Sequence, residues 1–197
     1  LSQNQTWRAL LHSNEKGISK MQGQQFFLAN QGSRDPFEEL KMTIDLMTSE
    51  NLEVAKNIQC RFPARREFLR QNLSDFEKYV VICEEREAWI AKLKPQRLSL
   101  VFAAGYLNSA ASSFGHTFLI IKTSGDRGEF LDYAVNFSAR TGDEDGALFA
   151  LKGLFGLYPG KFALLPYHQL IKDYVNFEGR DLWEPETDFS IDEIRLL

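Results

Sequence analysis

The spacing of apolar residues changes near residue 97, and this change restricts the possible fold more than any other feature of the chain. Apolar residues recur at helical spacing in the earlier segments 7–12, 36–47, 64–73 and 83–93. Short β-branched or alternating runs predict later strands at 98–104, 117–122 and 128–137. We therefore expect an α+β fold, in which a mainly helical part, 1–97, packs on an antiparallel sheet within 98–197 and forms one domain with it.

Local patterns make finer predictions. The apolar run 26–28 ends in turn-forming residues, which favours a strand followed by a turn. The charged face of the helix over 36–47 is expected to be solvated, and residues 57–63 are expected to lead into the helix that follows. Residues 124–128 have the composition of a hairpin between the last two strands. Alternation along the final strand separates two faces, with Phe130, Asp132, Ala134 and Asn136 on one, and Leu131, Tyr133, Val135 and Phe137 on the other.

The candidate functional residue is His116, one of three histidines. A small, polar turn precedes it and a β-branched strand follows, so it is predicted to begin a core strand beside Gly115. Asn136, on the next strand, is placed where it could face the imidazole. Two interpretations are open: a core histidine satisfied by one hydrogen bond, or a catalytic imidazole.

Composition excludes several classes of protein. A net charge of -4 offers no basic face for nucleic acid, and a hydrophobic share of 44% is typical of a globular chain. No apolar run approaches the ~20 residues of a membrane-spanning helix. The acidic turn 142–146, which precedes an expected helix over 147–155, lacks the alternating spacing of a calcium loop, so no metal is expected. No cofactor is expected either.

The cysteines and the chain ends carry further expectations. Cys60 and Cys83 are the only cysteines and fit no zinc pattern, so they form either a disulfide or two separate buried thiols. The chain lacks an initial methionine, and we expect that a targeting segment was removed or that the chain is a piece of a longer protein. Ser190 and Glu193 have capping-box spacing, which predicts a helix start and leads us to expect more chain beyond Leu197.

The sequence resembles the N-terminal periplasmic domain of Lnb-type bacterial lipoprotein N-acyltransferases. The resemblance covers essentially the whole chain and is carried by Cys60-Arg-Phe-Pro-Ala-Arg65, Cys83 with Trp89, Tyr106-Leu-Asn108, Ser113-Phe-Gly-His-Thr-Phe-Leu119, Tyr133-Ala-Val-Asn-Phe137, Lys152-Gly-Leu154, Pro166-Tyr167 and Arg180-Asp-Leu-Trp-Glu184. It implies a cell-envelope protein in the periplasm, a Cys60–Cys83 disulfide, and a permuted papain-like (NlpC-like) core.

The same resemblance implies roles for individual residues. His116 would be the general base for a cysteine nucleophile, and Asn136 would orient its ring. The family places that cysteine after Leu197, so this chain alone is expected to be inactive. The acyl donor would be a phospholipid and the acceptor a lipoprotein amine, with the membrane close to the missing C-terminal region. The substrate contacts are expected from motif residues Tyr106, Asn108, Ser113 and Phe114.

Alternative functions are also open. The domain could be a non-catalytic envelope module that binds a lipid or peptide in a groove walled by aromatic residues, namely Phe102, Tyr106, Phe114 and Phe118. It could also be a papain-like amidase or hydrolase. A serine hydrolase is disfavoured, because Ser112 and Ser113 lie too close to His116 in sequence and no Gly-x-Ser-x-Gly motif is present.

Overall fold

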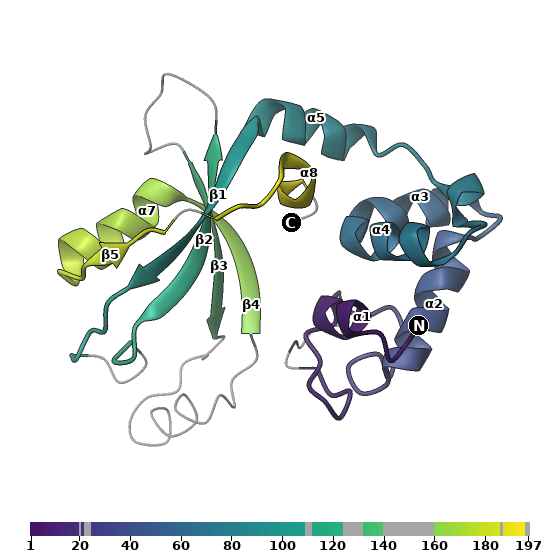
Figure 1. The fold of residues 1–197 in the computed structure, drawn as a ribbon, viewed down its shortest axis with the longest axis horizontal. Helices are drawn as coiled ribbons and strands as arrows, with labels where there is room; N and C mark the ends of the chain where they lie inside the picture. The colour runs from purple at the N-terminus through teal and green to yellow at the C-terminus, as the bar shows by residue number, and fades with distance from the viewer. Residues whose placement is uncertain are drawn as a thin grey trace. The chain divides into compact units, whose positions relative to one another are not determined.

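The chain divides into two compact units, a helical unit of residues 1–91 and a sheet unit of residues 92–195. The computed structural model describes residues 1–19, 21, 25–108, 112–123, 132–139, 160–185 and 187–195. The predicted α+β class, with a helical N-terminal half and an antiparallel sheet, is confirmed (Figure 1). The expected hairpin 124–128, the acidic turn 142–146 and the helix 147–155 lie outside the described residues.

Three of the short helices in the helical unit begin at a polar cap. Its elements are α1 (Gln5–Leu10), α2 (Pro36–Met47), α3 (Leu52–Arg61), α4 (Pro63–Asn72), the 3-10 turn η1 (Phe76–Tyr79) and α5 (Glu84–Leu93), which continues into the sheet unit. Asn4, Asp35 and Asn51 accept hydrogen bonds from first-turn N–H groups of α1, α2 and α3. These bonds satisfy donors that a helix leaves without partners, so the caps fix where the helices start.

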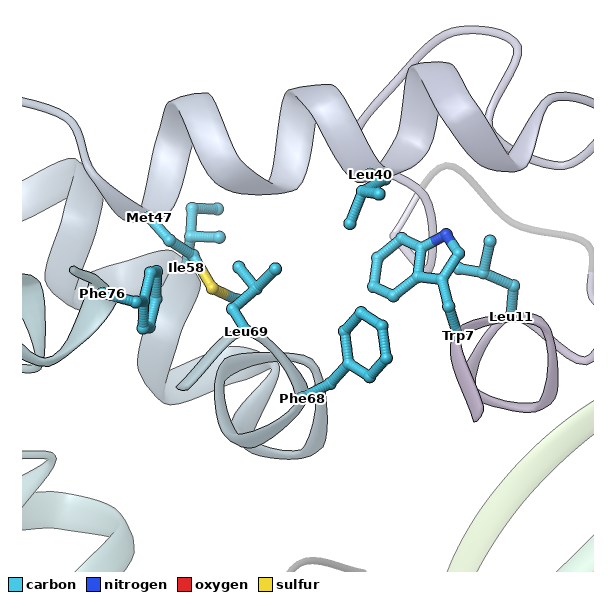
Figure 2. Close-up of a cluster of buried hydrophobic side chains, with 8 residues drawn as sticks. All are labelled: Trp7, Leu11, Leu40, Met47, Ile58, Phe68, Leu69 and Phe76. Carbon is cyan, nitrogen blue, oxygen red and sulfur yellow. The ribbon is translucent and has the colours of Figure 1, made fainter. Parts of the chain in front are cut away.

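The core of the helical unit lies among α1, α2, α3, α4 and η1. Figure 2 shows its fully or nearly buried side chains: Trp7, Leu11, Leu40, Met47, Ile58, Phe68, Leu69 and Phe76. The rings of Trp7 and Phe68 lie 5.4 Å apart between centroids, and the Trp7 indole N–H donates to the carbonyl of Pro36 at 2.9 Å. Each helix therefore contributes one apolar stripe to a shared core.

The predicted strand at 26–28 is wrong. The charged face of α2 is solvated as expected at Glu38, Lys41 and Asp45, and Glu39 is the exception. Glu39, on α2, is fully buried and accepts hydrogen bonds from the N–H groups of Leu28 and Ala29. Arg65 of α4 pairs with Glu39 at 2.5 Å and donates to the carbonyl of Phe26 at 2.7 Å. The backbone here bonds to buried side chains, so it needs no neighbouring strand.

Residues 57–63 lead into α4, as expected, but α3, to which the residues up to Arg61 belong, was not predicted. The buried positions of α3 include Gln59, a polar residue that weakens the apolar pattern. The Gln59 amide donates to the carbonyls of Met47 and Tyr79, at 2.8 Å each, and accepts from the Val81 N–H. A buried amide with these bonds is as stable in the core as an apolar residue would be.

The sheet unit contains one antiparallel sheet in the order β4-β3-β2-β1-β5. Its elements are β1 (Pro95–Ala103), β2 (His116–Thr123), β3 (Tyr133–Ala139), β4 (Gly160–Pro166), α7 (Tyr167–Ile171), the π-helical turn η3 (Lys172–Phe177), β5 (Leu182–Trp183) and α8 (Ile191–Ile194). The register pairs Ala103 with His116 and Phe118 with Asn136. The pairing of consecutive strands thus brings residues that are distant in sequence together at the end of the sheet where His116 lies.

Opposite faces of the sheet pack against different helices. Val101, Phe118, Ile120 and Ala134 pack with Tyr167 and Leu170 of α7. On the other face, Leu98 and Ile121 pack with Ile194 of α8, and Figure 1 shows α7 and α8 on opposite sides. The predicted alternation of β3 is confirmed for the described residues, because Asp132, Ala134 and Asn136 are buried whereas Tyr133 and Phe137 are exposed.

The outer side of β1 is only partly covered by a strand. β5 has two residues and pairs with Phe102 and Ala103. Beyond it, the Leu100 N–H donates to the Pro185 carbonyl at 3.3 Å, and the Thr187 hydroxyl donates to the Leu98 carbonyl at 2.5 Å. The segment after β5 therefore continues to occupy the hydrogen-bonding groups of β1 without forming a strand.

Candidate functional site

The site is built around His116, which begins β2 opposite the last residue of β1, as predicted. The turn before it is closed by the Ser112 carbonyl, which accepts from the N–H groups of Tyr106 and Gly115 at 2.9 and 3.2 Å. Gly115 has a φ of 86°, and a Cβ there would lie 2.8 Å from the Ala103 carbonyl oxygen. Only glycine fits this close approach, so the turn holds His116 against the end of β1.

Asn136 hydrogen-bonds to His116 across β2 and β3. Nε2 of His116 lies 2.5 Å from Oδ1 of Asn136, whose side chain is buried. An amide oxygen can only accept, so Nε2 carries the proton and the lone pair of the neutral ring is on Nδ1. The pair therefore fixes both the ring orientation and the tautomer, with a basic nitrogen on the side away from Asn136.

Aromatic rings surround the imidazole on the face covered by α7 and η3. The Tyr174 ring lies 6.0 Å from the His116 ring between centroids, and the Phe118 ring lies 6.3 Å away. Burial raises the pKa of the Tyr174 hydroxyl, and the positive charge of Arg180 opposes this only in part. The phenol is consequently a neutral group at physiological pH, and it adds no charge beside His116.

Arg180 fixes the strand end that pairs with His116. Its guanidinium is buried, donates to the carbonyls of Ala104 and Ala103 at 2.5 and 3.2 Å, and pairs with Glu178 at 2.9 Å. It also lies 4.6 Å above the centre of the Tyr174 ring. One side chain thus holds both the end of β1 and a ring that contacts the imidazole.

The motif residues predicted to contact substrate all lie in the segment between β1 and β2. Asn108 is exposed and its amide donates to the Tyr106 hydroxyl at 3.3 Å. Phe114 is exposed and Ser113 is half-buried. The structure therefore collects Tyr106, Asn108, Ser113 and Phe114 in the chain segment that leads into His116, and their substrate contacts stay a prediction.

Sequence reasoning did not assign Tyr174 or Arg180 to the site. Arg180 lies in a motif that carried the family resemblance, so that motif was the available signal. Tyr174 had no such signal, because its contact with His116 depends on how η3 crosses the sheet.

The two cysteines lie in the helical unit, not in the sheet unit that carries His116. Cys60 and Cys83 form a disulfide, which confirms that prediction. A cavity of about 750 Å³ in the helical unit is lined by both cysteines and by charges of both signs, including Glu53, Lys56 and Glu85. Among the described residues, no group of three acidic, histidine or cysteine side chains is arranged to hold a metal ion.

Comparisons with known proteins match both halves of the chain. Residues 85–197 match the family described as the Lnb N-terminal periplasmic domain, and residues 1–72 match a family described as a domain of unknown function (DUF7843). No curated protein and no solved structure matches. The first match confirms the family resemblance over residues 85–197, and with it the periplasmic location, whereas the motif over residues 60–65 lies within the second match. Within the described ranges, every helix is too short or too polar to cross a bilayer.

Proposed function

Because the chain belongs to the family of Lnb N-terminal periplasmic domains, we propose that it supplies the histidine half of a cysteine-dependent acyltransferase site. The observation that supports this most is the 2.5 Å contact between Nε2 of His116 and Oδ1 of Asn136. This contact leaves Nδ1 as the base. The neutral amide of Asn136 and the packed rings of Phe118 and Tyr174 hold the imidazole ring in place. Such a pair has the two functions that a cysteine nucleophile needs, proton acceptance and a fixed direction.

The nucleophile in this proposal is a cysteine that the family resemblance places after Leu197. Cys60 and Cys83 cannot act, because sulfurs joined in a disulfide form no thiolate. His116 takes the thiol proton as the sulfur attacks the ester carbonyl of a phospholipid. The lysophospholipid oxygen then leaves with that proton, and a thioester remains on the cysteine. A lipoprotein amine attacks the thioester, gives its proton to His116, and returns the thiol.

The test replaces His116 with alanine in the complete gene product. We expect acyl transfer to fall by about 10²–10⁴-fold, the usual contribution of a general base. His168→Ala is the matched control, because His168 is exposed on α7, and this variant should retain transfer. Asn136→Ala should reduce transfer less, since the base remains but loses its orientation. Full transfer by His116→Ala, with the fold intact, would refute the proposal.

A second candidate function is a non-catalytic module that binds a lipid or peptide. It is favoured by one observation, that Phe114, two residues before His116, is 76% exposed. In that case His116→Ala would leave ligand affinity unchanged. A papain-like amidase would use the same His116–Asn136 pair with water as the acceptor, and mass analysis of the product separates a free acid from an acylated amine.

A further inference from the structure

The hydrogen bond to Asn136 restrains the His116 ring at one point, close to the axis about which the ring turns. This bond selects the tautomer and one of the two flipped orientations of the ring. Nε2 lies near the line of the Cβ–Cγ bond, so a partner at Nε2 resists smaller rotations about that bond only weakly. Nδ1 lies farther from the line and swings with each rotation. The contacts on the faces of the ring therefore set the final direction of Nδ1.

Two aromatic rings, those of Phe118 and Tyr174, pack on the imidazole. Phe118 lies in β2, two residues after His116, and its ring stacks on that of Tyr174 with 5.8 Å between centroids. Tyr174 lies 6.0 Å from the imidazole and also holds the second ring that packs on it. A single side chain from outside β2 thus restrains both rings.

Tyr174 is carried by the π-helical turn η3, which continues directly from α7. The residues that flank η3 keep the right-handed helical conformation, and the Glu178 N–H donates to the carbonyl of Asp173, five residues earlier. At ordinary helical spacing Phe177 would follow Tyr174 on the face that packs on the sheet, but Phe177 is 72% exposed. The wider turn moves this apolar side chain off the sheet. Such turns are rare and occur frequently at functional sites.

The chain after η3 returns so that Arg180 holds the Tyr174 ring. The Arg180 N–H donates to the Tyr174 carbonyl at 2.8 Å, and the guanidinium lies 4.6 Å above the ring centre. The guanidinium also donates to the carbonyl of Ala103, the residue that pairs with His116 across β1 and β2. The contacts form a closed circuit from His116 through Tyr174 and Arg180 to Ala103, so a shift of one member disturbs the others.

We propose that Tyr174 is a positioning residue of the acyltransferase site, whose ring limits rotation of the imidazole and so keeps Nδ1 directed at the cysteine thiol. This role rests on the proposed function, because the direction of Nδ1 matters only if that atom takes a proton. The ring acts by contact alone, since burial raises the pKa of the phenol and leaves it without charge. Misplacing a catalytic group by about 1 Å can cost about 100-fold in rate.

Acyl transfer by the complete gene product tests this role. Tyr174→Leu keeps an apolar side chain but removes the flat ring, so kcat should fall by about 10–100-fold while KM for the phospholipid stays the same. Tyr174→Phe returns the ring and should restore most of the lost rate. Tyr133→Leu is the matched control, because Tyr133 lies on the opposite face of the same sheet, and this variant should retain the parental rate.

Carbon NMR relaxation of the histidine rings in the 197-residue chain is a second measurement, and it needs no nucleophile. The His116 ring should be as rigid as the backbone in the parent chain and in Tyr174→Phe, and should gain motion on the ps–ns timescale in Tyr174→Leu. The Nε2–H tautomer should persist in all three, because Asn136 is unchanged. A mobile His116 ring in the parent chain would overturn the positioning role even if Tyr174→Leu did not fold.

The remaining outcomes separate the positioning role from the proposed function. Parental transfer by Tyr174→Leu would overturn the role, and an equal loss in Tyr174→Phe would overturn it by assigning the effect to the hydroxyl. An equal loss in Tyr133→Leu would do the same, because any disturbance of the sheet would then suffice. Acyl transfer that survives His116→Ala would instead refute the proposed function and leave the result on ring motion standing.

Discussion

Replacing Gly115 with alanine should destabilise the sheet unit by about 2–5 kcal/mol, which combines a backbone penalty and a steric overlap. The backbone penalty arises because Gly115 has a φ of 86°, where a side chain costs about 1–2 kcal/mol. The overlap arises because the new Cβ would lie 2.7 Å from the Phe102 ring and 2.8 Å from the Ala103 oxygen. The ring can turn into solvent, but Arg180 holds the oxygen in place. Relieving such an overlap costs about 1–3 kcal/mol.

Gly179→Ala is the matched control for the backbone penalty. Gly179 has a φ of 63° and no atom within 4 Å of the position of a Cβ, so alanine there should cost only about 1–2 kcal/mol. Both changes also reduce the entropy of the unfolded chain by the same amount, which cancels in the comparison. The difference of about 1–3 kcal/mol between the variants therefore measures the contact beneath His116.

Urea unfolding measures this difference, followed by amide NMR signals from β1 and β2 so that the helical unit does not contribute. With a slope of about 2 kcal/mol per molar urea, the two midpoints should differ by about 0.5–1.5 M. Equal midpoints would show that β1 and the turn before His116 do not press together, and the account of how the histidine is held would be wrong.

Other predictions concern the disulfide, the pH dependence of stability and the placement of the imidazole. Replacing Cys60 and Cys83 by serine should lower the free energy of unfolding of the helical unit by roughly 3 kcal/mol, and an unchanged urea midpoint would contradict this. Burial first, and then a nearby arginine charge, lower the pKa of His12 below its ordinary value of about 6.5. The unfolded chain then binds more protons, so stability should be present above pH ~6.5 and decline as the pH falls towards the lowered pKa. His12→Gln should remove this decline in thermal unfolding measured across that range. Arg180→Lys keeps the charge but loses the forked hydrogen bonds, so nitrogen NMR should show His116 departing from the single Nε2–H tautomer; a parental spectrum would refute the positioning role.

Features that depend on neighbours in sequence could be predicted from the sequence. The helix over 36–47 has a proline at its start and apolar residues on one side, and the structure begins and ends α2 at the same residues. The position of His116 followed from a polar turn before a β-branched run, and the inward face of Asn136 followed from alternation along β3. These patterns reflect the local geometry of helices and strands.

Features that depend on distant contacts could not be predicted in the same way. Residues 26–28 look like a strand, but the carboxylate of Glu39 accepts the N–H groups that a strand would have paired. Arg180 reaches the carbonyl of Ala104 from a turn near the opposite end of the sheet unit's sequence. No periodicity encodes which donor meets which acceptor after the chain folds, because that choice is made by packing.

The segment after β5 covers part of the outer edge of β1 and so hinders pairing of this edge with strands of other chains. A long uncovered strand at the margin of a sheet offers unpaired N–H and C=O groups to other chains and promotes aggregation. Here the Pro185 carbonyl and the Thr187 hydroxyl bond to Leu100 and Leu98, and a proline at this place cannot extend the ladder further. By occupying this edge, Pro185 and Thr187 therefore help to keep the protein from aggregating in the periplasm.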